Sequence, residues 1–125
     1  MVKSVILSFR DLRIWRLGID IVKETYRITN SFPKKEPYGL CSQMQRASVS
    51  VPSNIAEGHI RASRKEFNQF LRIALGSLAE LETQAVISLE LGYIQQETYN
   101  DFVKMLNDES KQIRSLTKKL LIPKP

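Results

Sequence analysis

Residues 63–91 read SRKEFNQFLRIALGSLAELETQAVISLEL, a long stretch of helical periodicity in the middle of the chain. Apolar side chains recur in it at intervals of three and four residues, as on the buried side of an amphipathic α-helix. The seam consists of Phe67, Phe70, Leu71, Ala74, Leu78, Leu81, Ala85 and Leu89. Ser63 and Glu66 fit an N-terminal capping box, and Gly92 suits a C-terminal cap. We expect this helix at the centre of a helical bundle.

The rest of the 125-residue chain divides into similar segments on either side of this helix. Clusters of Gly, Pro, Asn and Ser mark loops between the segments, and no segment sustains the alternation of a β-strand. The predicted helices span about 11–30, 38–58, 63–91 and 95–121. The length suits one domain over residues 1–125. The predicted fold class is all-α, an antiparallel up-down four-helix bundle.

The second predicted helix contains a proline, Pro52, in its interior. Proline lacks the backbone N–H that the helix uses and crowds the preceding turn, so a kink is expected there. Polar residues run beside the apolar seam of this helix and recur on the later helices. We expect a structural hydrogen-bonded network made of Gln43, Arg46, Asn54, Glu57, Glu80, Gln84 and Glu109. The alternative interpretation is a polar binding cleft between these helices.

Glu109 is the most unusual member of this predicted network. On a helical wheel it falls among apolar residues such as Phe102 and Ile113. A carboxylate in such a place must find a partner or shift its pKa. Arg46 and Arg72 are the candidate partners.

The first predicted helix carries apolar residues over an unusually wide arc. One stripe contains Leu12, Trp15, Ile19, Val22 and Tyr26. A second stripe, nearly opposite, contains Ile14, Leu17, Ile21 and Ile28. A helix at the corner of a lone bundle needs less apolar surface than this, so we expect the second stripe to form a contact between copies of the chain. The alternative is a helix buried deeply within its own monomer.

The formal net charge of +6 is spread unevenly. Residues 1–72 carry a local charge of +7, residues 73–110 carry −6 and residues 111–125 carry +5. The candidate phosphate-binding residues are Arg13, Arg16, Arg61, Arg64, Lys65, Lys118 and Lys119. Such groups give salt-dependent binding to RNA or DNA with little base readout. The alternative interpretation is a set of solvated surface charges.

Residue types that usually carry catalysis are scarce. His59 is the only histidine, and its spacing from Glu57 fits neither a bundle metal site nor a nucleophile–histidine pair. The five glycines are dispersed, so the sequence has no phosphate-cradling loop. We therefore expect no enzymatic activity, no metal and no cofactor.

Cysteine usage and hydropathy bear on the compartment. Cys41 is the only cysteine, which favours a reducing environment. Residues 1–9 show neither a long apolar region nor a cleavage site, and no apolar run approaches membrane-spanning length. A cytoplasmic protein without a membrane partner is expected.

Several motifs, taken in order, resemble one protein family. They include FRDLRIW at residues 9–15, SVPSNIAEG at residues 50–58 and LGYI at residues 91–94. The chain is similar, along nearly its whole length, to the proteins encoded in 23S rRNA intervening sequences, the S23 ribosomal protein family. His59 and Ile60 depart from the small or polar residues usual there.

This resemblance implies a four-helix bundle that assembles as a homopentamer. It also implies kinship with the accessory protein of diversity-generating retroelements, which engages nucleic acid and a reverse transcriptase. The predicted function is accordingly a non-enzymatic homo-oligomeric bundle that binds RNA or DNA through basic clusters. The alternative is a protein-interaction scaffold for a nucleic-acid enzyme, without direct nucleic-acid contact.

Overall fold

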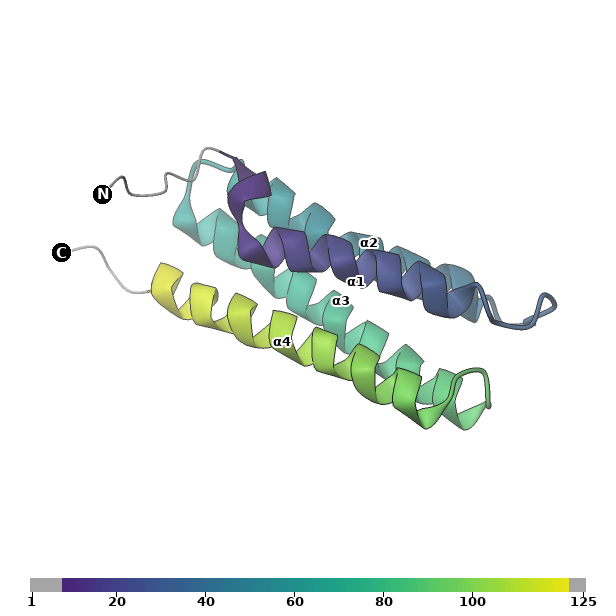
Figure 1. Ribbon diagram of the computed structural model, residues 1–125. Helices are drawn as coiled ribbons and strands as arrows, with labels where there is room; N and C mark the ends of the chain where they lie inside the picture. Colours follow the sequence, from purple (N-terminus) through teal and green to yellow (C-terminus); the bar gives the residue numbers. More distant parts are fainter. Residues whose placement is uncertain (1–7, 122–125) are drawn as a thin grey trace.

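The computed structural model describes residues 8–121, and its regular structure within this range is entirely helical (Figure 1). A short 3-10 helix, η1, spans Phe9–Asp11. The α-helices that follow are α1 (Arg13–Thr29), α2 (Leu40–His59), α3 (Arg64–Glu90) and α4 (Gln96–Leu121). The predicted all-α fold with four helices is confirmed, whereas the short helix η1 was not predicted from the sequence.

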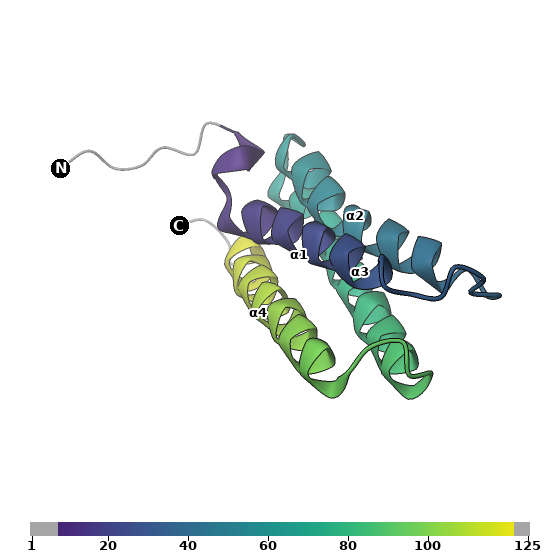
Figure 2. The ribbon, with the colours of Figure 1, turned by 45° about the vertical axis from the view of Figure 1, so that its right-hand side comes forward.

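The helices run alternately up and down, so that neighbours in sequence lie side by side (Figures 1 and 2). α2 packs on α1 and on α3, α4 packs on α3, and α1 also contacts α4. Figure 2 shows α4 diverging from α1 with distance from the end where α1 begins. At that same end α2 meets α3 and α4 finishes (Figure 1).

The core is formed by the facing apolar stripes of the helices. Its buried members include Ile14, Ile21, Ile28, Phe32, Leu40, Met44, Ala47, Val51, Ile55, Leu71, Ala74, Leu78, Leu81, Ala85, Ile94, Phe102, Leu106 and Ile113. Removing this apolar surface from water is the main stabilisation of the bundle, at about 25 cal/mol per Å².

Local signals in the sequence set the ends of α3. The Ser63 hydroxyl oxygen accepts a hydrogen bond from the backbone N–H of Glu66 at 3.1 Å, which confirms Ser63 as the N-cap. At the other end Gly92 has φ +78°, a conformation that glycine adopts without steric cost. The N–H groups of Gly92 and Tyr93 donate to the carbonyl oxygens of Leu89 and Ser88. This is a Schellman motif, which satisfies carbonyls that the helix end leaves free.

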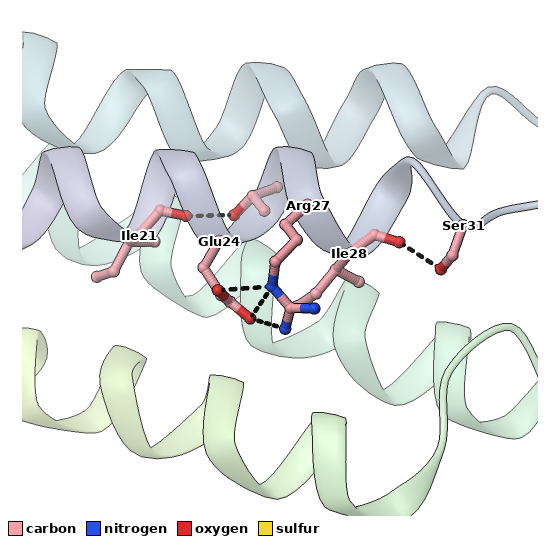
Figure 3. Close-up of polar contacts among 6 residues, drawn as sticks. Ile21, Glu24, Arg27, Ile28 and Ser31 are labelled. Carbon is pink, nitrogen blue, oxygen red and sulfur yellow. Dashed lines mark hydrogen bonds and ion pairs between the residues drawn. The ribbon is translucent and has the colours of Figure 1, made fainter.

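Polar side chains on α1 are satisfied within their own helix (Figure 3). The hydroxyl of Thr25, which is fully buried, donates to the carbonyl oxygen of Ile21 at 2.7 Å. Arg27 forms an ion pair with Glu24, one turn earlier on the exposed side. Because Thr25 is satisfied locally, it can lie in the core without a partner on another helix.

The predicted contact between copies of the chain through the second stripe of α1 is wrong. Ile14, Ile21 and Ile28 are at most 5% exposed and belong to the core of the monomer. Leu17 is half-buried and packs against that core. The physical reason is that the small residues Gly18 and Thr25 are buried on this side of α1 and let its neighbours approach. Of the opposite stripe, Leu12 and Trp15 still pack against the core, whereas Ile19, Val22 and Tyr26 are partly or largely exposed.

α2 is continuous from Leu40 to His59 and holds Pro52 in its buried interior, while the predicted kink there stays a prediction. Gly58 lets the end of α2 approach α3 closely. A methyl group placed at Gly58 would lie 2.7 Å from Cβ of Phe70 and 3.0 Å from Cδ1 of Phe67. Since these distances are shorter than normal contacts, any larger residue must push the two helices apart.

We expect Gly58→Ala to destabilise the protein by about 1–3 kcal/mol, because overpacking outweighs the gain in helix propensity. Gly76 is the matched control, since it lies inside α3 with nothing within 4 Å of an added methyl group. Gly76→Ala should stabilise the protein by about 0.5–1 kcal/mol. Urea unfolding of both variants measures the two changes, and equal effects would contradict the proposed close approach.

Candidate nucleic-acid interface and a buried carboxyl group

The antiparallel topology gathers the predicted basic residues at one end of the bundle. Arg13 and Arg16 lie in the first turns of α1, and the α2–α3 turn and the last turns of α4 lie at the same end (Figure 1). The residues of this basic end are Arg13, Arg16, Arg61, Arg64, Lys65, Lys118 and Lys119. Lys124 is also basic but lies outside the described residues.

Two of these cations have acidic neighbours. Arg61 forms an ion pair with Glu57 at 2.6 Å and lies over the ring of Phe70 at 5.1 Å. Arg16 lies 3.6 Å from Asp20, one turn further along α1. Both pairs are largely exposed, so they hold the side chains weakly and leave them within reach of a phosphate.

Arg64 has a structural contact that its sequence context did not indicate. Its guanidinium donates a hydrogen bond to the backbone carbonyl oxygen of Lys119 at 2.5 Å. The last carbonyls of a helix have no partner within the helix, so Arg64 caps α4 from the first turn of α3. This side chain ties the two ends together and is therefore less available to a ligand than the exposed Lys65.

A groove between α1 and α4 extends the basic end along the bundle. Its lining residues are Arg13, Arg16, Leu17, Asp20, Asp108, Lys111 and Gln112. Lys111, which lines this groove, belongs to the basic C-terminal segment of residues 111–125.

The predicted polar network does not form as a unit. Within residues 8–121, no side-chain hydrogen bond or ion pair joins any two of Gln43, Arg46, Asn54, Glu57, Glu80, Gln84 and Glu109. The hydrogen bonds centre instead on Ser50, whose hydroxyl is 2.8 Å from that of Ser77 and 2.9 Å from Nδ2 of Asn54. Polarity at helical spacing does not set the distances between side chains on different helices, which a hydrogen bond requires to be about 3 Å.

The alternative interpretation, a polar binding cleft, requires these polar side chains to face a common hollow. Arg46 and Glu80 are exposed, Glu57 is paired with Arg61, and Gln43 donates to the carbonyl oxygen of Tyr38 at 3.4 Å. Gln84 is buried, and its Oε1 has no hydrogen-bond partner.

Glu109 is the ionisable group that the fold buries most deeply. Its side chain is 0% exposed, and neither carboxyl oxygen has a hydrogen-bond partner. The predicted partners Arg46 and Arg72 both lie on the surface, so the expectation of an ion pair is wrong. Burial raises the pKa of Glu109 to about 8 from its ordinary value of 4.5, because removal from water disfavours the charged form. The carboxyl group is therefore mostly protonated at neutral pH.

The room for this carboxyl group comes from a glycine. A methyl group at Gly18 would lie 3.2 Å from Oε2 of Glu109 and 3.3 Å from Cβ of Pro52. Gly18, Pro52 and Glu109 thus meet where α1, α2 and α4 converge.

Neither a metal site nor a membrane-spanning helix is found within residues 8–121. No group of His, Cys, Asp and Glu side chains in this range could hold a metal ion. None of the helices described is long and apolar enough to cross a membrane.

The fold and its surface define the chain as a four-helix-bundle protein with a basic end. Residues 10–115 match the family model described as 23S rRNA-intervening sequence protein. The chain belongs to this family. No curated protein matches it.

A solved structure supports the fold assignment. It is a protein of unknown function from the S23 ribosomal protein family of Bacteroides thetaiotaomicron, with a TM-score of 0.76 and 21% sequence identity. The alignment covers 84% of this chain and 98% of the other. Identity at this level establishes a common fold.

We expect the free energy of unfolding to fall as the pH rises from about 5 to about 8, by about 1.4 kcal/mol per pH unit. In this range native Glu109 retains a proton that the unfolded chain has released, so raising the pH favours unfolding. Urea unfolding followed by circular dichroism at several pH values measures the slope.

Glu109→Gln should flatten this pH dependence, because the amide does not titrate. Asp108→Asn is the matched control, since Asp108 is the exposed neighbour on α4 and its removal should leave the slope in place. A slope that persists in Glu109→Gln would assign the effect to other groups.

Proposed function

We propose that this protein is a non-enzymatic, homo-oligomeric bundle that binds RNA or DNA through phosphate contacts at its basic end. The observation that carries the proposal is the convergence of cations from α1, the α2–α3 turn and α4 at one end (Figure 1). Phosphate contacts need charge and reach rather than a shaped pocket, and exposed Lys and Arg side chains supply both.

The charge distribution favours an end-on approach. Residues 73–110 carry a local charge of −6, and their acidic members at the α3–α4 turn, such as Glu90, Glu97 and Asp101, lie at the end opposite the basic one. A polyanion is attracted to one end and repelled from part of the other. The bundle therefore presents a defined surface to nucleic acid although its net charge is modest.

Support for a non-enzymatic role comes from the groove beside the basic end. The groove between α1 and α4 contains charged side chains but no histidine, cysteine or serine that a base could activate. Glu109 lies nearby but is fully buried, so it has no access to a substrate in this conformation. The exposed cations of this groove can bind a polyanion, and the proposal gives them that role.

Self-association fits a strip different from the one predicted. Ile19, Val22 and Tyr26 on α1 are partly or largely exposed, and Tyr26 lines a shallow groove together with Val49 of α2. Tyr26 is 46% and Val49 is 41% exposed. We call Ile19, Val22, Tyr26 and Val49 the outer strip, and we assign to it the contact between copies of the chain, because it is apolar, continuous and free of core packing partners. In an assembled ring or dimer each copy adds its own basic end.

The combined variant Lys65→Glu, Lys118→Glu, Lys119→Glu should lose affinity for RNA and duplex DNA by at least about tenfold at about 50 mM salt. Wild-type affinity should fall steeply between about 50 and 200 mM salt, and the variant should show a slope smaller by about 1 for each lost phosphate contact. Fluorescence anisotropy measures both quantities.

Lys34→Glu, Lys35→Glu is the matched control, because these exposed lysines lie in the α1–α2 loop at the opposite end. It should leave binding nearly unchanged. Equal losses in both variants would show a non-specific charge effect. Absence of wild-type binding at the lower salt would contradict the proposal and favour a scaffold that contacts only protein.

Val49→Asp should dissociate the oligomer, because a charge in the outer strip must be desolvated on association. Ile73→Asp is the control, since Ile73 is 51% exposed on α3, outside the strip. Light scattering coupled to size exclusion gives the masses. A monomeric wild-type protein at micromolar concentration would contradict the self-association proposal.

A further inference from the structure

Pro52 creates an unmet hydrogen-bonding need inside α2. In an α-helix the N–H of residue 52 would donate to the carbonyl oxygen of Ser48, but proline has no N–H. Ser48 is 0% exposed, so water cannot reach this carbonyl from the surface. The Ser48 hydroxyl does not solve the problem, because it donates to the carbonyl oxygen of Gln45 at 2.8 Å. A buried carbonyl without a donor is costly, so a donor from elsewhere is expected.

Glu109 presents the complementary problem at the same place. Its carboxyl group is fully buried, and neither oxygen accepts a hydrogen bond. A neutral carboxyl group has one O–H to donate, and burying that O–H without an acceptor is costly. The carbonyl oxygen of Ser48 thus lacks a donor, and the O–H of neutral Glu109 lacks an acceptor.

Pro52 and Glu109 both border the hollow at Gly18. A methyl group added to Gly18 would lie 3.2 Å from Oε2 of Glu109 and 3.4 Å from Cδ of Pro52. The proline Cδ occupies the place of the missing amide hydrogen and sits against the carbonyl of the residue four earlier, here Ser48. Oε2 of Glu109 and Cδ of Pro52 thus border the same hollow and are at most 6.6 Å apart.

We propose that the neutral carboxyl group of Glu109 donates its O–H to the backbone carbonyl oxygen of Ser48, and so acts as a proton-dependent clasp between α4 and α2. The step is a hydrogen bond, and no covalent bond changes. It accounts for three residues together: Pro52 frees the acceptor, Glu109 supplies the donor, and Gly18 leaves the space.

The surrounding charges do not replace this bond. On α1, Arg16 is engaged with Asp20, and both line the groove outside the core. On α4 itself, Asp108 and Lys111 line the same groove. On α3, Glu82 is exposed beside α4. The buried face of α2 near Pro52 has no ionisable side chain. None of these groups forms an ion pair with Glu109 among the described residues.

The clasp links two helices that do not otherwise pack together, because α2 and α4 lie diagonally across the bundle. Loss of the proton removes the donor and places a charge in the core. The weakly packed side of the bundle, between α1 and α4, is then the part expected to open first, while the α2–α3 pair stays closed.

The decisive experiment compares a donor and a non-donor at residue 109, with and without the proline. Glu109→Gln keeps an N–H donor, and Glu109→Met has similar length but none. At pH 6 with Pro52 present, Glu109→Gln should have a folding constant about tenfold larger than Glu109→Met. In the Pro52→Ala background the backbone N–H that the substitution restores serves Ser48, so this advantage should vanish or reverse. Urea unfolding of the full chain gives the four constants.

Two outcomes would overturn the clasp. One is a Glu109→Met variant at least as stable as Glu109→Gln when Pro52 is present. The other is an advantage of Gln over Met that is the same in both backgrounds, which would mean that Ser48 is not the acceptor.

A second readout tests the proton directly in the wild-type side chain. The carboxyl carbon of Glu109, assigned by its loss in Glu109→Gln, should titrate near pH 8 in the wild-type protein. In Pro52→Ala the midpoint should fall by about one pH unit, because the neutral form loses its acceptor. Asp108→Asn should leave the midpoint unchanged. Titration of the wild-type carboxyl at its ordinary pKa, or an unchanged midpoint in Pro52→Ala, would refute the proposal.

Discussion

The packing of α2 against α3 is the contact on which the other helices depend. These helices approach closely at Gly58, where Phe67 and Phe70 fill the space that a side chain would need. Further along, the hydroxyl groups of Ser50 and Ser77 lie 2.8 Å apart. α1 then packs on α2, and α4 packs on α3, whereas α1 and α4 touch each other less extensively. The bundle is thus a tight central pair that carries two outer helices, and its open side is the groove between them.

The sequence indicated the helices well because the information needed is local. Apolar spacing sets the period, Ser63 begins α3, and Gly92 ends it through a left-handed residue. The rotation of α1 about its own axis could not be obtained in the same way. Two apolar stripes competed, and the choice was made by small residues: Gly18 and Thr25 admit close neighbours, so their side turned inward. A wheel counts hydrophobic residues but does not show which side a neighbouring helix can approach.

The candidate site shows the same division between local and long-range information. Each basic cluster was visible in the sequence, and the predicted topology is what brings the clusters to one end. The role of Arg64 was not predictable, because its contact with the carbonyl of Lys119 joins residues 55 positions apart. The predicted polar network failed for a related reason. Hydrogen bonds between helices require a particular rotation and a distance of about 3 Å, and polarity at helical spacing specifies neither. The isolation of Glu109 among apolar residues was a sound signal that allowed either a partner or a shifted pKa. The structure has the shifted pKa, and the expected ion pair with Arg46 or Arg72 is absent.

The separation of charge along the bundle has a consequence for how the molecule moves before it touches anything. With cations at one end and carboxylates at the α3–α4 turn, the charge of the protein is distributed unevenly along its long axis, although Lys34 and Lys35 lie at the acidic end. In the field of any extended polyanion such a body experiences a torque as well as an attraction, and both act over about a Debye length of 8–10 Å. Rotational alignment therefore begins before contact. A bundle that is already oriented when it meets the polyanion makes a larger fraction of productive encounters. Dissolved salt shortens the range over which this orientation acts.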